Sequence, residues 1–496
     1  TLMHEPPAIF LDEPTTGVDP ISRREIWTLV NEMVKQDGLT VFLTTSYMDE
    51  AERCHEVVLM HRGRIIAQGS PSELPGALDG SFAEIAVAGM EEQQSALRAL
   101  KRMPGIRSAY PLGEKIGCVY TETSCEAIRR YAEGEGARVE SVSEASPCLE
   151  DVFLSKISEE GDAVDESALE EFFFEGEGSG AGGCEKREVM IETQNLEKRF
   201  GSFVAVDDLT FSIKSGEIFG FLGPNGAGKT TTIKMLCGLF PPTSGRGTIG
   251  GLDFFKEQFK IKKSIGYMSQ KFSLYRDLTV EENIVLYGGI YGVPRKELAR
   301  RKGLILKMAG LSGEGDAITG ELPMGIKQRL ALGCAIIHKP PCIFLDEPTS
   351  GVDPAARRQF WDIIYLLSRR MGVTVLVTTH YMDEAEHCDR LSLMTRGKLV
   401  ALGHPSELKG RVSKDIGKLL EICTPDPFSA VDCLRGEYRH CFVFGAGVHL
   451  YTSDPKREAL RIKSALEAHG VEVSGIGEGA IPFEDVFVYF CENVEG

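Results

Sequence analysis

The sequence of 496 residues lacks several features that mark particular classes of protein. No apolar run reaches the ~18–20 residues of a membrane span, so none is expected. The 55 basic residues are outnumbered by 73 acidic ones, and the net charge of −18 argues against a general nucleic-acid binder. The 13 cysteines include no C-x-x-C pair. This absence favours reduced, buried thiols in a cytosolic protein over a disulfide scaffold or a metal cluster.

Tryptophan is scarce as well, and the two that occur, Trp27 and Trp361, lie 334 residues apart. The same offset relates several longer matches, which chance does not produce. We therefore interpret the chain as a tandem duplication. Residues 1–157 are called the first copy and residues 189–496 the second copy. The matching pairs are Ile9–Thr15 with Ile343–Thr349, Gly17–Pro20 with Gly351–Pro354, Arg23–Arg24 with Arg357–Arg358, Tyr47–Glu52 with Tyr381–Glu386, and Glu150–Phe153 with Glu484–Phe487.

The second copy begins near Val189, and the counterpart of this position would lie about 145 residues before Thr1. We therefore expect the first copy to be truncated at its start and the sequence to be a fragment of a longer chain. Between the copies, residues 158–188 form a predicted linker. Nine acids and no base fall between Glu159 and Glu177, and a glycine-rich run follows. This composition predicts a flexible, solvated tether, with Phe172–Phe174 as an alternative small docking patch.

A phosphate-binding motif stands in the second copy. An apolar strand predicted at Glu217–Leu222 is followed by the pattern G-x-x-x-x-G-K-T and then by a helix predicted at Thr231–Leu236. Glycines let backbone N–H groups turn towards phosphate oxygens, the lysine adds positive charge, and the threonine hydroxyl can ligate Mg²⁺. The binding candidates of this loop are Gly223, Pro224, Asn225, Gly226, Ala227, Gly228, Lys229, Thr230 and Thr231.

Two adjacent acids stand at the end of a second apolar strand, predicted at Cys342–Glu347. In a phosphate-loop ATPase the first acid, here Asp346, lies near Mg²⁺. The second, here Glu347, can orient and polarise the attacking water.

With these motifs the chain resembles the ATP-binding cassette (ABC) transporter ATPases, across both copies and most of its length. Gln270, 41 residues after Lys229, looks like the glutamine of the Q-loop. His380 looks like the switch histidine that contacts the γ-phosphate. The resemblance implies ATP and Mg²⁺ as cofactors. It implies catalytic roles for Glu347, His380 and Gln270, nucleotide contacts by Phe200 and Asp353 (in the D-loop), and metal ligation by Thr230, Gln270 and Asp346.

One element departs from the family pattern. The signature loop, usually Leu-Ser-Gly-Gly-Gln, reads Leu322-Pro323-Met324-Gly325-Ile326. Pro323 removes a hydroxyl and an N–H that would face the γ-phosphate bound by the opposite cassette. In the first copy Ser46 replaces the switch histidine, although Asp12, Glu13 and Asp19 are kept. We interpret the kept acids of the first copy as a strand end retained for packing, with an impaired catalytic site as the alternative.

A second module follows each cassette, and its predicted strand–helix–strand–strand–helix–strand order suggests a ferredoxin-like fold. It resembles the C-terminal extension of drug-resistance ABC ATPases, and a role in packing or dimerisation is favoured over ligand sensing. The predicted fold class is α/β, and the predicted segments are a partial first cassette at 1–79, its extension at 80–157, the linker at 158–188, a complete second cassette at 189–412 and its extension at 413–496.

The predicted function is ATP hydrolysis that drives export, as in multidrug efflux, by a separate permease. The chain is expected on the cytoplasmic face of the membrane, without nucleic acid, and with its cassettes forming a sandwich within one chain or between two. A tandem-cassette translation factor is the alternative, but the degenerate signature and the acidic linker disfavour it. A structural subunit that binds ATP without turnover is a third possibility.

Overall fold

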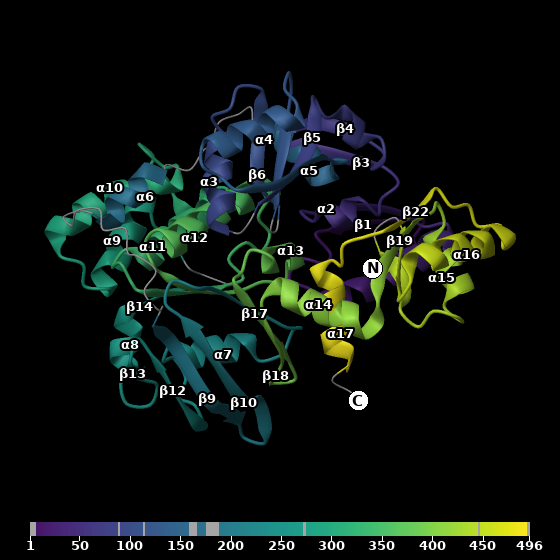
Figure 1. Ribbon diagram of the computed structural model, residues 1–496. Coiled ribbons are helices and arrows are strands. Elements are labelled where there is room, and N and C mark those ends of the chain that lie inside the picture. Colours follow the sequence, from purple (N-terminus) through teal and green to yellow (C-terminus); the bar gives the residue numbers. More distant parts are fainter. Residues whose placement is uncertain are drawn as a thin grey trace. The chain divides into compact units, whose positions relative to one another are not determined.

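The structure is a computed structural model that describes residues 6–87, 90–112, 115–157, 166–174, 188–270, 274–444 and 447–493 (Figure 1). The chain divides into two compact units. The first comprises Thr1–Thr44, Asp162–Arg411 and Pro482–Gly496, and the second comprises Thr45–Gly161 and Val412–Ile481. Within the described ranges, no helix combines the length and the apolar character needed to cross a membrane.

A six-stranded sheet organises the first unit. Its strand order is β14-β15-β16-β11-β17-β18, and every neighbouring pair is parallel except β17 and β18. All residues of β11, β15 and β16 are buried, as expected for a parallel sheet covered on both faces. The strands are β11 (Ile218–Leu222), β14 (Ile265–Met268), β15 (Cys342–Asp346), β16 (Thr374–Thr378), β17 (Arg390–Thr395) and β18 (Lys398–Gly403).

An antiparallel sheet of order β10-β9-β12-β13 belongs to the same unit, and β9, β10 and β12 lie side by side in Figure 1. Apolar residues of the two sheets and of α7 form one buried core, which includes Phe211, Phe219 and Phe344. The predicted burial of Cys237, Cys334 and Cys342 is confirmed. The strands are β9 (Val189–Phe200), β10 (Phe203–Lys214), β12 (Ser244–Ile249) and β13 (Leu252–Asp253).

Helices of the first unit begin at recognisable caps. Thr279 and Glu282 form a capping box at the start of α9, and Asp353 caps α12 with proline next to it. The helices are α7 (Lys229–Leu236), α8 (Gln258–Ser264), α9 (Val280–Ile290), α10 (Arg295–Ala309), the 3₁₀ turn η4 (Thr319–Glu321), α11 (Met324–Ile336), α12 (Pro354–Arg369), α13 (Met382–Ala385) and α17 (Phe483–Glu492), while α14 (Pro405–Ile416) crosses the boundary between the units.

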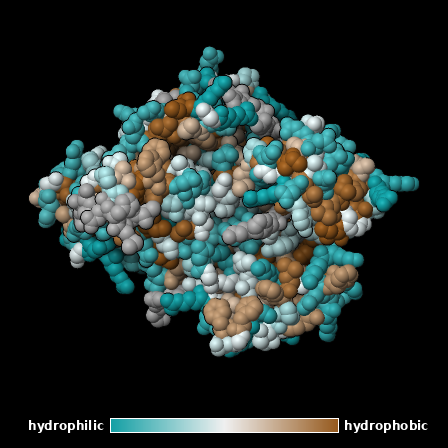
Figure 2. All heavy atoms as spheres, turned by 180° about the vertical axis from the view of Figure 1, so that it is seen from behind, coloured by the Kyte–Doolittle hydropathy of each residue, from teal (hydrophilic) through white to brown (hydrophobic). Residues whose placement is uncertain are grey.

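The first copy contributes a parallel pair to this unit, β1 (Ala8–Asp12) and β2 (Thr40–Thr44), joined by α1 (Pro20–Asp37). Phe10 is 78% exposed and Phe42 is 60% exposed, whereas their counterparts Phe344 and Leu376 are fully buried. Figure 2 shows brown, hydrophobic side chains interrupting the hydrophilic surface in several places. The same apolar sequence pattern thus lies in the core in one copy and at the surface in the other.

The predicted linker contains a helix, α6 (Glu166–Phe174), so the expectation of a flexible tether is wrong for these residues. Helix α6 packs against α10, and the two lie side by side in Figure 1. Ala168, Leu169 and Phe172 are buried. Lys339 donates a hydrogen bond to the carbonyl of Phe173 at 3.4 Å, and its Nζ lies 5.7 Å from the Phe172 ring centroid. The rest of the predicted linker, 158–165 and 175–187, lies outside the described residues.

The second unit holds two antiparallel sheets, of orders β6-β7-β5-β8 and β20-β21-β19-β22. Each arises from a strand–helix–strand–strand–helix–strand succession, which is the order predicted from the sequence. The first set is β5 (Ser81–Val87), α3 (Met90–Leu100), β6 (Ile106–Leu112), β7 (Lys115–Tyr120), α4 (Cys125–Gly134) and β8 (Val139–Glu144). The second set is β19 (Lys418–Cys423), α15 (Pro427–Leu434), β20 (Cys441–Phe444), β21 (Gly447–Thr452), α16 (Pro455–Ala468) and β22 (Gly475–Glu478).

Further first-copy elements complete the second unit. Buried residues of the hairpin β3–β4 and of α5, such as Leu59 and Val152, share one small core. The elements are α2 (Met48–Ala51), β3 (Val57–His61), β4 (Arg64–Gly69), the 3₁₀ turn η2 (Leu74–Ala77) and α5 (Leu149–Ile157).

Candidate functional site

Four adjacent strands of the six-stranded sheet bring the candidate residues together. Gln270 follows β14, Glu347 follows β15, His380 follows β16 and Lys229 follows β11. Because these strands are parallel, their carboxyl ends meet at one edge, where open α/β sheets bind ligands. Residues from 229 to 380 in the sequence thereby converge on one site.

The loop after β11 depends on glycine at two positions. Gly226 and Gly228 have φ angles of 79° and 102°, in the region that side chains rarely adopt. A Cβ on Gly228 would lie 2.4 Å from the carbonyl oxygen of Ala205, whereas a Cβ on Gly226 would meet nothing within 4 Å. Gly228 caps α7, which therefore begins at Lys229 and not at the predicted Thr231. The loop thus ends at the N-terminus of a helix, where anions are stabilised.

Lys229 is the buried cation of the site, with 5% exposure. Its Nζ donates to the carbonyl oxygens of Gly223 at 2.6 Å and Pro224 at 3.1 Å. Burial lowers the pKa of Lys229, and the Glu347 and Asp346 carboxylates oppose this shift only in part. Among the described residues Lys229 forms no ion pair. A buried ammonium group that has only neutral partners is suited to an incoming anion.

The adjacent acids occupy different environments. Asp346 is 3% exposed and accepts a hydrogen bond from Thr378 Oγ1 at 2.7 Å. Burial raises the pKa of Asp346, Glu347 raises it further, and the Thr378 bond acts against both. Glu347 has a φ of 50°, and its N–H donates to the carbonyl and the hydroxyl of Thr378. Thr378 therefore orients both acids from the neighbouring strand.

The carboxylate of Glu347 lies between two side chains. His380 Nε2 lies 2.5 Å from its Oε1, and Gln270 Nε2 donates to its Oε2. His380 is 5% exposed, and its Nδ1 is buried without a partner among the described residues. Glu347 is thus in direct contact with both of the other predicted catalytic residues.

The remaining loop and adenine candidates, Thr230, Thr231 and Phe200, are partly or fully exposed. The Thr230 side chain is exposed and makes no hydrogen bond within the described part of the chain, and Thr231 is half-buried. Phe200 is 47% exposed, packs edge-on against Phe240 and has Lys198 Nζ 5.2 Å from its ring centroid. Phe200 therefore offers an accessible aromatic face of the kind that a base can stack on.

Asp353, predicted to contact nucleotide, caps α12 by accepting from the Ala356 N–H at 3.0 Å. Within the described ranges it makes no hydrogen bond to the phosphate loop. Its first-copy counterpart Asp19 does, because Oδ2 of Asp19 accepts from the Asn225 N–H at 3.5 Å. Asn225 Nδ2 also donates to the Gly17 carbonyl at 2.9 Å. Sequence reasoning assigned Asp19 a structural role, and the repeat alone does not say which copy faces the loop.

The departing signature loop has a packing role that the sequence did not reveal. Pro323 caps α11, and Met324 is 45% exposed. A Cβ on Gly325 would lie 2.4 Å from the Cβ of Ala356, so this glycine lets α11 approach α12. Packing therefore accounts for the kept glycine without any contact to phosphate.

In the first copy, Asp12 and Glu13 repeat the hydrogen bonds that Asp346 and Glu347 make in the second copy. Thr44 Oγ1 donates to Asp12 Oδ1 at 2.5 Å, and the Glu13 N–H bonds Thr44, as Thr378 does with Asp346 and Glu347. Glu13 has a φ of 45°, close to the 50° of Glu347. Oε2 of Glu13 accepts a hydrogen bond from the hydroxyl of Thr16 at 2.5 Å, so the carboxylate is bound by a neighbour in its own loop.

Comparisons with known proteins agree with this geometry. The sequence pattern of the ABC transporter family matches residues 206–350. A probable multidrug ABC transporter ATP-binding protein, YbhF of Escherichia coli K12, is 42% identical over 416 residues, which cover 84% of this chain and 70% of that protein. The Nod factor export ATP-binding protein I of Burkholderia lata is 38% identical over 275 residues, 55% of this chain and 89% of that protein.

Two further matches cover shorter parts of the chain. The linearmycin resistance ATP-binding protein LnrL of Bacillus subtilis is 39% identical over 227 residues, 46% of this chain and 73% of that protein. A solved structure of an ABC transporter's ATP-binding subunit is 27% identical with a TM-score of 0.42, covering 45% of this chain and 93% of that chain. The long match to the Escherichia coli protein and the family pattern over the phosphate loop together establish that this chain belongs to the family of ABC transporter ATP-binding proteins and is an ATPase.

Proposed function

We propose that this chain is the ATP-hydrolysing subunit of an ABC-type exporter and that it drives a separate membrane permease. The observation that carries the proposal is the convergence of Lys229, Glu347 and His380 at one edge of the parallel sheet. The names of the relatives, which include multidrug, Nod factor export and linearmycin resistance proteins, support export as the process.

In the proposed mechanism, the phosphate loop binds the triphosphate of ATP. Lys229 exchanges its carbonyl partners for phosphate oxygens, which gives it the anionic partners that it lacks. The backbone N–H groups around Gly226 and Gly228 and the N-terminus of α7 add further donors. Phe200 supplies an apolar face for the adenine ring.

Two oxygen ligands of the site fit Mg²⁺. The Thr230 hydroxyl is exposed, and Asp346 Oδ2 accepts no hydrogen bond from the described residues. Such hard oxygen donors are those that Mg²⁺ prefers. The Gln270 side chain donates to Glu347. Gln270 can therefore ligate Mg²⁺ only after it breaks this hydrogen bond. The bound ion would neutralise charge on the β- and γ-phosphates.

Glu347 is proposed to orient and polarise the water that attacks the γ-phosphate. Its carboxylate is 8% exposed and is fixed by His380 and Gln270, yet each oxygen retains a free acceptor direction. The unpartnered Nδ1 of His380 is a candidate to bind the γ-phosphate or the water once the ring turns. If Gln270, which follows β14, breaks its hydrogen bond to Glu347, the carboxylate becomes available to the water. The position of Gln270 would then control the proposed base.

The tandem organisation is part of the proposal, with cassettes at 1–79 and 189–412, extensions at 80–157 and 413–496, and a connection at 158–188. The sequence repeat supports it, and so does the contact of Asp19 with Asn225, which joins the two copies beside the phosphate loop. The strand order of the antiparallel sheets supports ferredoxin-like extensions. We propose a site of action on the cytoplasmic face of the membrane, reached through the permease.

The test is export of a fluorescent drug from cells that carry the wild-type protein or Glu347→Gln. Export should depend on the carboxylate, and the tagged protein should sediment with membranes in both strains. Membrane sedimentation separates this function from the alternative, because a translation factor would follow ribosomes in a sucrose gradient. A protein found only with ribosomes, in cells whose export does not respond to the variant, would contradict the proposal.

A further inference from the structure

Four charged side chains, three of them buried and one half-buried, join the first copy to the C-terminal helix of the second copy, both within the first compact unit. Arg23 Nη2 lies 2.8 Å from Glu484 Oε2, and Arg24 Nε lies 2.9 Å from Glu484 Oε1. Arg24 Nη2 lies 2.6 Å from Asp485 Oδ1. We call these four residues, which are separated by about 460 positions in the chain, the charge cluster.

The charge cluster is largely removed from water. The side chains of Arg23, Glu484 and Asp485 are 5%, 6% and 2% exposed, and that of Arg24 is 18% exposed. Burial lowers the pKa of Arg24, but Glu484 and Asp485 together outweigh this effect and raise it. The two acids also stand in the first turn of α17, where the helix dipole favours negative charge. Two cations and two anions therefore compensate one another, and loss of one member leaves a buried charge unpaired.

Helix α1 links the charge cluster to the phosphate loop. It begins directly after Asp19, which caps it by accepting from the Ser22 N–H at 3.2 Å and also accepts from the Asn225 N–H. The distance along α1 from the cap to Arg23 is about one helical turn. The side chains that fix α1 thus act within one turn of the Gly17–Asp19 segment that contacts the loop.

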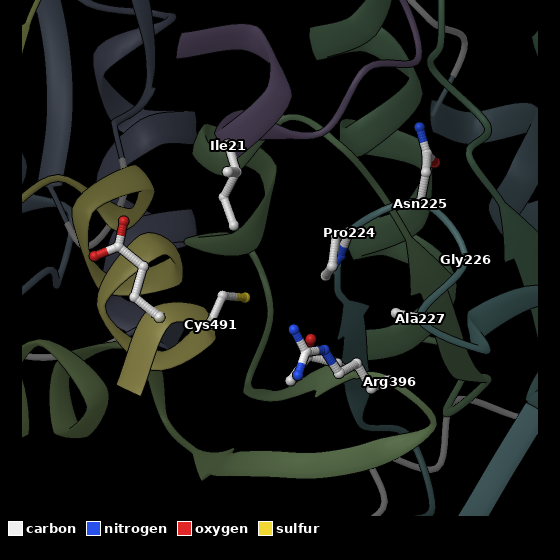
Figure 3. Close-up of a pocket in the computed structure, with 9 residues that line it drawn as sticks. Ile21, Pro224, Asn225, Gly226, Ala227, Arg396 and Cys491 are labelled. Atoms are coloured by element: carbon white, nitrogen blue, oxygen red, sulfur yellow. The ribbon is translucent and has the colours of Figure 1, made fainter. Parts of the chain in front are cut away.

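Helix α17 reaches the same loop with its other end. Cys491 and Glu492 line a pocket of about 420 Å³ together with Ile21 of α1 and Pro224 of the phosphate loop. Figure 3 shows Ile21 and Cys491 directed into this pocket from two different helices. The first turn of α17 therefore contacts α1 through the charge cluster. The last turn of α17 lines a pocket together with Ile21, in the first turn of α1, and with the phosphate loop.

We propose that the charge cluster holds the Gly17–Asp19 segment of the first copy against the phosphate loop of the second copy, independently of nucleotide. Arg23, Arg24, Glu484 and Asp485 are then positioning residues for the nucleotide site. Helix α17 of the second copy thereby determines where the Gly17–Asp19 segment of the first copy lies relative to the nucleotide site. This role is separate from the proposed export function and does not require it.

The repeat offers a matched control. Glu150 is the counterpart of Glu484 at the same place in the motif, but it is only half-buried, and its side chain forms no hydrogen bond or ion pair among the described residues. Arg357, the counterpart of Arg23, has Glu384 as an acidic neighbour at 3.9 Å and stacks on Tyr381. Glu150→Gln therefore makes the same chemical change outside the charge cluster.

The test measures amide hydrogen exchange of residues 15–24 and 223–229 without nucleotide, and ATP affinity by calorimetry. Glu484→Gln and Arg24→Glu should accelerate exchange in both segments and weaken ATP binding about 5-fold or more, whereas Glu150→Gln should change neither. The reversed pair Arg24→Glu with Asp485→Arg should restore protection in part, which a general loss of stability would not allow.

Arg24→Lys serves as the variant with least risk to folding, because it keeps the charge and loses only the forked hydrogen bonds. It should give intermediate exchange in residues 15–24. Unchanged exchange in that segment for both Arg24→Lys and Glu484→Gln would overturn the proposal. Equal acceleration over the whole chain, with no recovery in the reversed pair, would overturn it as well.

Discussion

Oε1 of Glu347 lies 2.5 Å from Nε2 of His380, so direct contact joins the residues that follow two neighbouring strands, β15 and β16. Gln270 holds the other carboxylate oxygen from the end of β14. Three consecutive strands of one sheet therefore fix a single carboxylate. This arrangement gives Glu347 little freedom before ATP arrives, which is the preorganisation that water activation requires.

Replacing Glu347 by glutamine should retain ATP binding and suppress turnover by ~10²-fold or more, because the phosphate loop remains intact while the proposed base is lost. Phosphate release and calorimetry on the same preparation measure the two effects. Glu13→Gln is the matched control in the first copy, and it should reduce turnover much less. Turnover that survives in Glu347→Gln would mean that another group activates the water.

Lys229→Ala should abolish measurable ATP binding, since the loop then lacks its only buried cation within the described ranges. Lys256→Ala removes an exposed lysine from the same unit and should leave affinity unchanged. Calorimetric titration with ATP distinguishes the two. Equal affinity in both variants would show that triphosphate binds elsewhere.

Gly228→Ala should impair both stability and ATP affinity. A left-handed backbone costs a non-glycine residue about 1–2 kcal/mol, and the new Cβ would also meet the Ala205 carbonyl at 2.4 Å. Gly251→Ala has a similar φ of 78° but open space around it, so it isolates the backbone cost. Thermal melting should show a larger loss for Gly228→Ala, and only that variant should bind ATP more weakly.

Acid should destabilise the fold partly through His387. Burial and, to a smaller extent, the charges of Arg358 and Arg357 together lower the pKa of this side chain to about 4. The unfolded chain, with an ordinary histidine pKa near 6.5, binds the proton first as the pH falls. Stability should therefore decrease between about pH 6.5 and pH 4, by roughly 1–3 kcal/mol from this residue. Urea titrations at several pH values, compared with His387→Gln, should show a flatter dependence in the variant.

The helix within the predicted linker should depend on Phe172. This ring is 2% exposed, so Phe172→Ser removes buried apolar surface and should release α6 from α10. Hydrogen exchange of residues 166–172 should become faster. Phe173→Ser keeps the carbonyl that Lys339 binds and should have a smaller effect. No difference between the two serine variants would show that α6 is held by other contacts.

The sequence predicts the phosphate loop, the acid pair and the sheet that carries them, because each depends on a short local pattern. It also predicts the convergence of Gln270, Glu347 and His380, through the resemblance and the meeting of parallel strand ends. The prediction that Asp353 contacts nucleotide depends on the arrangement of the two copies and not on a local pattern. The same motif occurs at Asp19, and only the fold reveals that the first-copy residue contacts Asn225.

Composition was misleading for the linker. Nine acids suggest solvation throughout, yet Ala168, Leu169 and Phe172 fall on one side of a helix at spacings of one, three and four residues. These three apolar residues inside an acidic run are sufficient for α6 to pack against α10. The partners of Arg23 and Arg24 could not be predicted at all, because pairs separated by about 460 positions leave no local pattern.

That separation has a consequence for synthesis on the ribosome. Arg23 leaves the ribosome long before Glu484 exists, and at ~5–20 residues per second the 461 intervening steps take about 20–90 s. During this interval α1 carries cations whose final partners have not been made. The nascent first copy must therefore stay hydrated at this face or be shielded by a chaperone, and the pairing of α1 with Glu484 and Asp485 waits until α17 has been translated.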